Sequence, residues 1–385
     1  MVDQRSQPLI EAMGLVAPGT PLREGLDRVL LAERGALIVL GDDAAVLSIC
    51  TGGFLLDAEF SPQRLSELAK MDGAIIVAAD ASRIARANVH LVPKASIPTS
   101  ETGTRHRTAE RVARSIDVPV IAVSEAMATI TVYRNDRQHV LQRSERLLDR
   151  AGQALSTLQR FKSRFDQALA ALSALEVEDA VSVRDVVAVL QPGEMVVRIA
   201  EEVESYLVEL GEDGRLIHLQ LQETTGGTVA TLRLVIRDYV ATSGATGHAG
   251  GARLDGAGGR PELRRTRSVA ARDERIDRVV RALRSLTPEE LLDPATVSAT
   301  VGLGLTGEGL DAPVEPRGYR LLHRLPRVSD TIIDGIVDRF ATLGGIMQAS
   351  LSDLEKVGGV GGVKARSVKD GLARMVEASI LERYE

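Results

Sequence analysis

The hydrophobic pattern of this sequence changes character once, close to residue 145. Before that point, apolar residues gather in short runs that are rich in β-branched side chains, at 36–40, 74–79, 89–92 and 118–123. Short unbroken runs of this kind are typical of strands buried on both faces, whereas 128–133 alternates like a half-exposed strand. Segments 63–70 and 104–116 carry their apolar residues at helical spacing instead. We therefore predict one α/β domain with a mixed sheet over residues 1–145.

After residue 145 the apolar residues recur at every third or fourth position. Over 148–172 this spacing describes one long amphipathic helix, and the helical pattern continues through 182–211. The stretch 229–240 is apolar enough to form another buried element. Residues 242–262 then hold seven glycines and few large apolar side chains, which predicts a mobile linker. We predict a helical linker or spine domain over residues 146–315 that includes this Gly-rich segment.

A third domain is predicted at the C-terminal end. Pro313, Pro316 and Gly318 interrupt the helical pattern and mark the entry into a small all-α domain over residues 316–385. The predicted fold class is multidomain, with an α/β domain around a central mixed sheet followed by all-α parts. A length of 385 residues agrees with this division, since domains average about 150 residues.

Composition narrows the class of protein. No stretch approaches the roughly 20 apolar residues that a membrane span needs, and the N-terminal residues resemble neither an export signal nor a transit peptide. The single cysteine, Cys50, fits a reducing compartment, so we expect a cytoplasmic protein without a membrane partner. A net charge of −6 and an aromatic content of 3% argue against a dedicated nucleic-acid binder. Residues 317–385 nevertheless hold 11 basic and 9 acidic side chains, which leaves room for a local nucleic-acid surface.

The first candidate site joins two segments that are far apart in the sequence. Asp72-Gly73-Ala74 stands at the start of a predicted buried strand, and Gly103 with Thr104 opens a predicted helix. Gly73 allows a ligand to approach the backbone closely, and the free N–H groups at the start of a helix favour an anion. Asp72 alone also suits an ordinary turn or helix cap, which is the commonest use of Asp before Gly.

The start of this predicted helix adds charge and hydroxyl groups. Arg105 and Arg107 bring permanent positive charge suited to phosphate oxygens, and Thr104 and Thr108 can donate hydroxyl hydrogen bonds. His106 can equally cap the helix or pack. Two cations at a helix N-terminus oppose the helix dipole, so their presence favours a bound anion over a solvated first turn. These residues predict a polyphosphate cradle, although the Gly-rich Lys-Ser/Thr signature of a P-loop is absent.

The two segments resemble the signature motifs of the diadenylate cyclase family. The matching residues are Asp72-Gly73-Ala74 and Arg105-His106-Arg107, and the stretches 61–71 and 120–125 fit the same family. The order of a cyclase domain, a helical spine and a small C-terminal helical domain is similar, from end to end, to the members of the family that scan DNA. The resemblance implies a nucleotidyltransferase that needs Mg²⁺ or Mn²⁺ and condenses two ATP molecules into cyclic di-AMP and two pyrophosphates.

The resemblance also implies roles for residues of this sequence. Asp72 would hold the metal ion and orient the attacking hydroxyl, with Arg105, His106 and Arg107 as further catalytic groups on the phosphates. The implied ATP-binding set is Gly73, Leu91, Thr104, Arg105, His106, Arg107, Thr108 and Ser124. Since one site cannot close the ring alone, the resemblance implies a homo-oligomer of facing protomers. The implied assembly is an octamer of two stacked tetrameric rings, located in the cytoplasm at the nucleoid.

The second candidate site lies near the C-terminus. Residues 354–368 fit the helix-hairpin-helix pattern, in which Gly359 and Gly361 let backbone amides of the turn reach a DNA phosphate. Lys364 and Arg366 add positive charge at the same place, which favours DNA binding over a Gly-rich turn that only packs. Such contacts read the DNA backbone without sequence preference, and the resemblance implies branched or damaged DNA as the target.

An upstream segment repeats the spacing of this hairpin. Residues 322–333 carry Arg327 and Ser329 where the hairpin glycines stand in the second copy. We predict that this half keeps the packing role and has lost some of the phosphate contact.

Two alternatives stay open. Residues 253–284 hold ten arginines and five acids, a pattern that favours a solvated helix face with intrahelical ion pairs over a phosphate-binding surface. The protein could also be a non-catalytic, ATP-sensing DNA-scanning protein with a vestigial cyclase site. The intact Asp72 and Arg105-His106-Arg107 argue against this alternative, because a site kept only for binding could lose its metal carboxylate.

Overall fold

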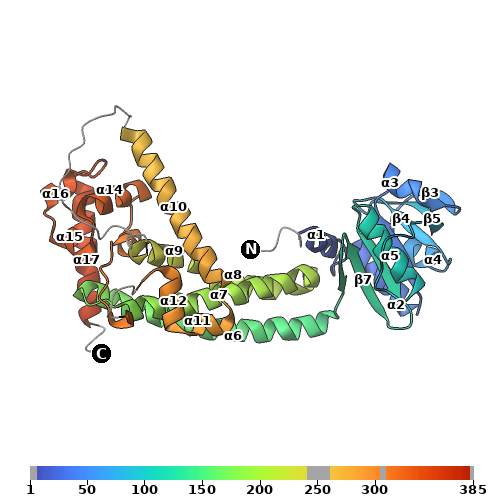
Figure 1. Ribbon diagram of the computed structural model, residues 1–385, viewed down its shortest axis with the longest axis horizontal. Helices are drawn as coiled ribbons and strands as arrows, with labels where there is room; N and C mark the ends of the chain where they lie inside the picture. Colours follow the sequence, from blue (N-terminus) through green and yellow to red (C-terminus); the bar gives the residue numbers. More distant parts are fainter. Residues whose placement is uncertain (1–6, 241–260, 304–308, 382–385) are drawn as a thin grey trace. The chain divides into compact units, whose positions relative to one another are not determined.

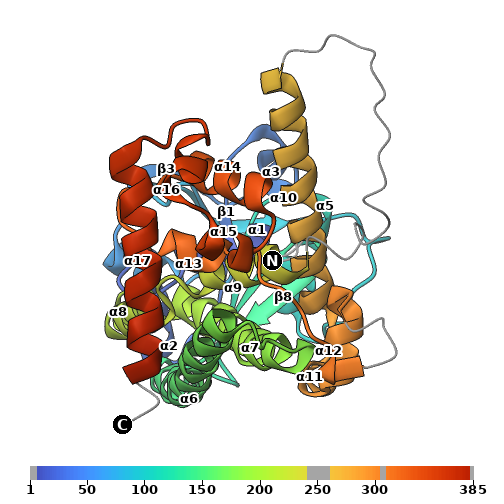
Figure 2. The same cartoon turned by 90° about the vertical axis from the view of Figure 1, so that its left-hand side faces the viewer.

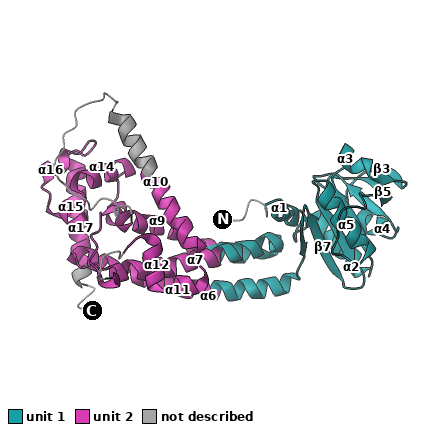
Figure 3. Cartoon of the chain, viewed as in Figure 1, with its two compact units in different colours: residues 1–155, 201–221 teal, residues 156–200, 222–385 magenta. Residues whose placement is uncertain are grey.

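The structure is a computed structural model that describes residues 7–240, 261–303 and 309–381. The chain divides into two compact units, residues 1–155 with 201–221 and residues 156–200 with 222–385 (Figure 3). The predicted domain boundaries at 145 and 315 rest on sequence pattern and stay predictions. The predicted linker 242–262 lies outside the described residues, except for its last two positions.

The first unit is built on a mixed sheet of eight strands. These are β1 (Ala36–Leu40), β2 (Cys50–Thr51), β3 (Phe54–Glu59), β4 (Ala74–Val77), β5 (Arg83–Leu91), β6 (Val120–Ser124), β7 (Thr129–Arg134) and β8 (Arg137–Val140). Their order is β2-β5-β4-β1-β6-β7-β8, with β3 also paired to β5. β1 and β4 run parallel and the other pairs run antiparallel, which confirms the predicted mixed sheet.

Helices cover both faces of this sheet, so β1 and β4 are buried along their whole length, as predicted. The helices are α1 (Gln7–Leu15), α2 (Pro21–Leu31), α3 (Ala44–Ser48), α4 (Pro62–Leu68) and α5 (Thr104–Ser115). Side chains of α1, α2 and α4 pack with Ile38 and Ile75 on one face, and those of α3 and α5 pack with Val39 and Ile76 on the other. Side-chain N-caps begin three of these helices, at Thr20, Asp43 and Ser61.

The segment 128–133 differs from its prediction as a half-exposed strand. In β7 the four residues from Ile130 to Tyr133 are all buried. Ile130 and Val132 pack into the cluster of α1 and α2, while Tyr133 packs on the opposite face with α5. The prediction was wrong because Thr131 and Tyr133 carry polar atoms, so the sequence alternates as if that face were wet.

Long helices follow the sheet, as predicted. α6 (Ser144–Glu178) is one continuous helix, and α7 (Val183–Leu210) extends the helical region with Pro192 inside it. The next elements are η1 (Gly211–Gly214), α8 (Arg215–Thr225), α9 (Thr228–Tyr239), α10 (Pro261–Ser285), α11 (Pro288–Leu292), α12 (Pro294–Val301) and η2 (Gly309–Asp311). In the second unit Phe165, Leu169 and Leu172 of α6 are buried in one core with side chains of α7, α9, α10 and α12.

The C-terminal part is all-helical. Its helices are α13 (Tyr319–His323), α14 (Asp330–Phe340), α15 (Leu343–Gln348), α16 (Leu351–Glu355) and α17 (Gly362–Leu381). They cluster together around a hydrophobic core of their own (Figures 1 and 2). Across the described ranges, no helix combines the length and the hydropathy needed to span a membrane.

The arginines of α10 make contacts that differ from the predicted intrahelical ion pairs. The arginine side chains before Arg272 lie outside the described residues. Arg272 is only 12% exposed, and its guanidinium contacts Asp334 at 3.2 Å and Asp338 at 2.8 Å, both in α14. Asp277 of α10 pairs in turn with Arg233 of α9 at 2.7 Å. These pairs join different helices on the packed side of α10. The other side keeps the predicted solvated face, with five exposed charged residues: Asp273, Glu274, Arg275, Arg278 and Arg281.

Candidate functional site

A cavity at one edge of the sheet gathers three segments that are distant in the sequence. It measures about 590 Å³ and is lined by Asp72, Gly103, Thr104, Arg105, His106, Val123, Ser124, Glu125 and Ala126. β4 and β6 lie on either side of β1, parallel and antiparallel to it, so the start of β4 and the end of β6 meet at the same edge. The first turn of α5 also lies at this edge. The topology therefore brings together the two segments of the first candidate site.

In the described structure, α5 begins without a capping side chain at its N-cap residue. Gly103 stands at the N-cap position and makes no side-chain hydrogen bond, in contrast with the capped starts of α2, α3 and α4. The first backbone N–H groups of a helix have no intrahelical partners, and together with the helix dipole they favour an anion. This end of the cavity is therefore suited to a phosphate group.

The loop before α5 is fastened to the helix by one buried carboxylate. Glu110 is 5% exposed. It accepts hydrogen bonds from the Thr99 hydroxyl and the Ser100 N–H, and it pairs with Arg114 at 2.9 Å. Burial raises the pKa of Glu110, but these hydrogen bonds and Arg114 outweigh burial and leave the pKa lowered. An ionised carboxylate thus holds the loop that leads into Gly103 and the start of α5.

Asp72 and Arg105 form an ion pair at the mouth of the cavity. Arg105 Nη2 lies 3.1 Å from Asp72 Oδ1, and the Asp72 side chain is 96% exposed. Gly35 makes room for the arginine, because a Cβ atom at that position would lie 2.3 Å from Arg105 Nη1. An exposed pair of this kind contributes at most about 1 kcal/mol to folding. Both charges are therefore available to a ligand at little cost in stability.

His106 is oriented by a chain of hydrogen bonds. Its Nδ1 lies 2.8 Å from the Tyr133 hydroxyl, which donates its one proton to Glu101 Oε1 at 2.9 Å. The hydroxyl must therefore accept a hydrogen bond from Nδ1–H of His106. Burial, and then the hydrogen bond to Glu101, raise the pKa of Tyr133, so the phenol stays neutral. Among the described residues, the buried Nε2 of His106 has no hydrogen-bond partner, and a ligand in the cavity that this histidine lines could supply one.

The neighbouring strand β5 leaves no room for a side chain at Gly73. A Cβ atom at Gly73 would lie 2.6 Å from the backbone of Asn88, a residue of β5 with a φ of +54°. The close approach that the sequence predicted is thus an approach of β5 to the chain just before β4. Gly73 does not line the cavity, and its contact with a nucleoside stays a prediction.

The other predicted ATP-binding residues divide into two groups. Thr104 and Ser124 line the cavity, and the Ser124 hydroxyl accepts a hydrogen bond from the N–H of Met127 at 3.3 Å. Thr108 donates its hydroxyl to the Thr104 carbonyl at 2.9 Å, within α5. Arg107 is exposed. Leu91 is 6% exposed and lies in the hydrophobic cluster beneath α5. These last three residues are not among those that line the cavity, and their contact with ATP stays a prediction.

Sequence reasoning missed two polar residues at this site and gave a third, Glu125, no role. Glu101 and Tyr133 orient His106, and Glu125 lines the cavity beside Ser124. No local pattern connects Tyr133 to His106, because β7 reaches α5 only through the tertiary fold. Glu125 follows directly on the strand whose end carries Ser124, within the stretch 120–125 that resembles the family.

The carboxylates of the cavity fit a metal ion that is shared with a substrate. In the described part of the chain, no three His, Cys, Asp or Glu side chains come close enough to hold a metal ion on their own. Asp72 and Glu125 are the two carboxylates of the lining. Mg²⁺ is commonly bound by one or two carboxylates together with phosphate oxygens and water. The residues present therefore suit a phosphate-bound Mg²⁺ or Mn²⁺ better than a metal site built from protein alone.

The second candidate site is a tight turn between α16 and α17. Gly359 has a φ of +84°, in the left-handed region that favours glycine. The side chains of Lys364 and Arg366 are exposed on the first turns of α17, and Lys364 Nζ donates to the Gly359 carbonyl at 3.1 Å. Gly361 is exposed, and a Cβ atom at this position would meet nothing within 4 Å. The four predicted DNA-binding residues are thus brought together at one exposed corner.

The upstream segment 322–333 repeats the geometry of this turn. The connections 324–329 and 356–361 have the same length, and Arg327, with a φ of +65°, occupies the position of Gly359. Leu322 and Leu354, which stand at matching positions before the turns, are both fully buried. The predicted packing role of this half is therefore confirmed, and its phosphate contact stays a prediction.

Family models and known proteins match most of the chain. Residues 23–138 match the family model "DisA bacterial checkpoint controller nucleotide-binding", and residues 141–255 match "DisA bacterial checkpoint controller linker region". A protein of Acidothermus cellulolyticus called "DNA integrity scanning protein DisA" is 49% identical over 382 residues, which cover 99% of this chain and 96% of that protein. A protein of Kineococcus radiotolerans with the same name is 48% identical over 376 residues, 98% of this chain and 97% of that one.

Proposed function

The chain belongs to the DisA family, and from this premise we propose that it is a diadenylate cyclase whose C-terminal domain binds DNA. One observation carries the catalytic half of the proposal. The cavity at the sheet edge joins Asp72, Arg105 and His106 with the uncapped start of α5, so a carboxylate, a guanidinium and free backbone donors face one space. Phosphate oxygens and a metal ion are the partners that such groups prefer.

In the proposed reaction, two ATP molecules held by two facing protomers react with each other. Each ribose 3′-hydroxyl attacks the α-phosphorus of the other ATP. Each attack forms an O3′–P bond, breaks the bond between the α-phosphorus and the bridging oxygen, and releases pyrophosphate, while the hydroxyl proton passes to solvent. Two such steps close cyclic di-AMP. Phosphoryl transfer of this kind depends mainly on positioning and charge neutralisation.

Each residue of the site has a role in this reaction. Arg105, Arg107 and the first N–H groups of α5 bind the triphosphate, and His106 donates from Nε2 to a phosphate oxygen when both of its ring nitrogens carry a proton. Asp72 accepts a hydrogen bond from the attacking hydroxyl and would also hold the Mg²⁺ or Mn²⁺ ion. The bound ion would neutralise charge on the phosphates. The remaining proposed ATP contacts are Gly73, Leu91, Thr104, Thr108 and Ser124.

Ring closure requires an oligomer. One cavity positions one ATP, so both phosphodiester bonds form only when two protomers face each other. We propose the octamer of two stacked tetrameric rings that the family resemblance implies, because it pairs every cavity with another. Its proposed location is the nucleoid, where the C-terminal turns would meet DNA.

The replacement Asp72→Asn tests the catalytic half. Purified full-length protein with ATP and Mg²⁺ or Mn²⁺ should release pyrophosphate and form cyclic di-AMP. The variant should be slower by about 100-fold or more, because it loses a charge that acts on the reacting groups. The matched control is Asp149→Asn, the same change at an exposed position of α6, which should leave the rate unchanged. A wild-type protein without product, or equal rates for both variants, would refute the proposal.

ATP binding separates the enzyme from the alternative function. A non-catalytic ATP sensor would bind ATP saturably and release no pyrophosphate under any metal condition. The enzyme should bind ATP in both the wild-type and the Asp72→Asn forms, and only the wild type should convert it. Equilibrium binding of radiolabelled ATP, measured beside pyrophosphate release, distinguishes the two functions.

The DNA half of the proposal rests on the two turns of the C-terminal domain. We propose that they form a paired helix-hairpin-helix module that binds the phosphate backbone of branched or damaged DNA. The positive φ of Gly359, the open space at Gly361 and the exposed Lys364 and Arg366 support this role. At the matching upstream turn, Arg327 would replace the lost glycine with a positive charge.

Replacing both Lys364 and Arg366 with Ala tests DNA binding. Affinity should fall about equally for all base sequences, and the slope of log affinity against log salt should become shallower by roughly 1.8, or about 0.9 for each lost phosphate contact. Arg374→Ala, an exposed arginine further along α17, is the matched control and should change neither quantity. Fluorescence anisotropy with several duplexes and a four-way junction gives both numbers. A loss that depends on base sequence would contradict backbone binding.

A further inference from the structure

We propose that Val363 makes the turn between α16 and α17 prefer DNA whose base stacking is interrupted, as at a branch point, over continuous duplex. The inference rests on the DNA half of the proposed function and deepens it, because it names the feature of the DNA that is read. Val363 is the second residue of α17, and its side chain is 86% exposed. Single exposed apolar residues are common on protein surfaces, so it is the position of Val363 that indicates a partner.

The position of Val363 puts an apolar group beside bare backbone. The exposed turn before it contains four glycines, at positions 358, 359, 361 and 362, while Val360 between them is 5% exposed and packs into the core. Side chains of an α-helix lean toward its N-terminus. Val363 therefore leans toward the exposed turn, whose backbone N–H groups would meet a phosphate in the proposed complex.

The upstream turn shows that the fold does not require a valine at this position. With Leu322 matched to Leu354, Thr331 of α14 occupies the position of Val363. Thr331 is also exposed, and its hydroxyl lies 3.1 Å from that of Ser329. A polar residue is the ordinary choice at the start of a helix, where backbone N–H groups need acceptors. Since the same turn is built with threonine upstream, the role of Val363 is directed outward and is not one of packing.

The charges around Val363 favour a nucleic acid as this partner. Residues 355–366 carry three basic side chains and one acid, all exposed, so the partner must bring negative charge as well as an apolar contact. DNA offers an extended apolar contact chiefly where the face of a base is exposed, because continuous stacking hides these faces.

The size of the contact decides which DNA is preferred. Burying one valine side chain is worth about tenfold in affinity, whereas separating two stacked base pairs costs about a hundredfold. Val363 therefore cannot open an intact duplex, but it gains affinity where a branch has already interrupted the stack.

Two replacements at Val363 test the proposal on the full chain. Val363→Thr keeps the shape of the side chain and copies Thr331, but its hydroxyl is costly to bury, so affinity for a four-way junction should fall about fivefold. Val363→Ile adds one methylene and should raise that affinity up to about fourfold. Affinity for a duplex with the sequence of one junction arm should not change in either variant, because its bases stay stacked. Fluorescence anisotropy at one salt concentration gives these affinities.

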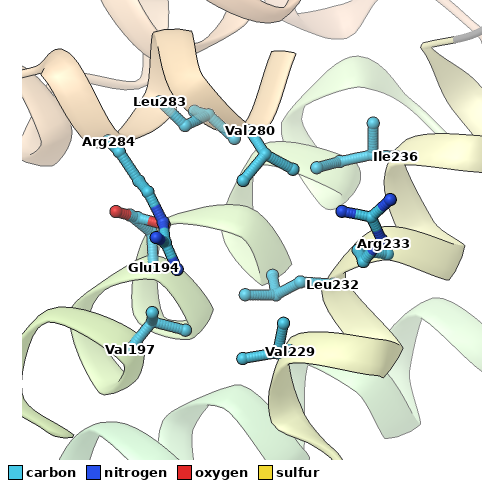
Figure 4. Close-up of a pocket in the computed structure, with 9 residues that line it drawn as sticks. All are labelled: Glu194, Val197, Val229, Leu232, Arg233, Ile236, Val280, Leu283 and Arg284. Atoms are coloured by element: carbon cyan, nitrogen blue, oxygen red, sulfur yellow. The ribbon is translucent and has the colours of Figure 1, made fainter. Parts of the chain in front are cut away.

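Val229→Thr is the matched control. Val229 is also the second residue of its helix, α9, and is 50% exposed, but it lines a separate cavity between α7, α9 and α10 (Figure 4). This variant should bind both DNAs as the wild type does. The inference is overturned if Val363→Thr lowers junction and duplex affinity alike, if it leaves the preference for the junction unchanged, or if Val229→Thr has the same effect.

Failure of the proposed function would look different. A wild-type chain that binds neither DNA would refute DNA binding, and this inference with it. A wild-type chain that binds duplex and junction equally tightly, with the salt dependence of phosphate contacts, would refute only the preference assigned to Val363.

Discussion

The hydroxyl of Tyr133 decides which nitrogen of His106 faces the cavity. Because it donates to Glu101, it can only accept from Nδ1 of His106, and this leaves Nε2 for a ligand. Tyr133 is 1% exposed, so the ring itself is held by the core between β7 and α5. Tyr133 therefore acts as a positioning residue in the proposed enzyme, because it orients the imidazole without lining the cavity.

Replacing Tyr133 with Phe should slow catalysis without weakening substrate binding. The ring keeps its packing, but His106 loses the hydroxyl that orients it, so kcat for cyclic di-AMP formation should fall about tenfold while KM for ATP stays within about twofold. Tyr206→Phe, which removes a hydroxyl bonded to Glu202 within α7, is the control and should leave both constants unchanged. Steady-state kinetics gives kcat and KM for both variants. An equal change in kcat for the two variants would contradict a positioning role for Tyr133.

At the scale of elements, a buried acid joins α9 to the start of α13. The carboxylate of Asp238 accepts the N–H groups of Tyr319 and Arg320 at 2.6 and 2.8 Å and so caps the helix that leads into the upstream turn. Close by, Arg320 pairs with Glu176 of α6, which also accepts the Tyr239 hydroxyl at 2.6 Å. Burial, and then the charge of Glu176, raise the pKa of Asp238 to about 7.

This pKa predicts that the α9–α13 junction weakens as pH rises. The folded chain binds the proton of Asp238 more tightly than an exposed Asp with a pKa of about 3.9. The resulting stabilisation is complete below about pH 4 and is lost as pH rises through about 7. Protection of the α13 amides, measured by hydrogen exchange and corrected for intrinsic rates, should fall by up to about 100-fold between pH 5 and pH 8.

The variant Asp238→Asn should remove most of this pH dependence, because its side chain does not titrate. Asp370→Asn, the same change at an exposed position of α17, should keep the wild-type behaviour. A pH profile of Asp238→Asn protein that matches the wild type would show that another group is responsible. Glu176 and Arg320 are the charged neighbours to replace in that case.

At the scale of the whole molecule, the proposed reaction needs two chains. Each chain contributes one cavity with one Asp72, and the cyclic product contains two bonds that form by the same chemistry. A symmetric pair of facing sites is the simplest arrangement that makes both bonds. Activity should therefore depend on the number of intact pairs and not on the number of intact chains.

Mixed oligomers test this dependence. If wild-type and Asp72→Asn chains are co-expressed in equal amounts and pair at random, about a quarter of the facing pairs hold two intact sites. Cyclic di-AMP formation should then fall to about a quarter of the wild-type value. Co-expression with Asp149→Asn chains should leave it unchanged. A fall to one half would mean that single chains complete the reaction.

Much of the architecture and both candidate sites could be predicted from local sequence. Each of these features is formed by residues that are close together in the sequence, so a short segment is enough to predict it. They are the apolar runs of β1 and β4, the helical spacing along α6, and the motifs around Asp72 and Gly359. The positive φ of Gly359 is also a local feature, because a tight turn favours glycine at that position whatever surrounds it.

Other features follow from contacts between segments that are distant in the sequence. The order β4-β1-β6 brings Asp72 and Glu125 to one edge, and β7 carries Tyr133 to His106. The packing of α10 against α14 makes Arg272 an interhelical contact, although its local charge pattern predicts a solvated face. Strand order and helix packing are set by burial of the whole core. The hydrophobic periodicity of a single segment does not determine them. The chemical groups of the site are thus readable from the sequence, while their orientation and partners depend on the tertiary fold.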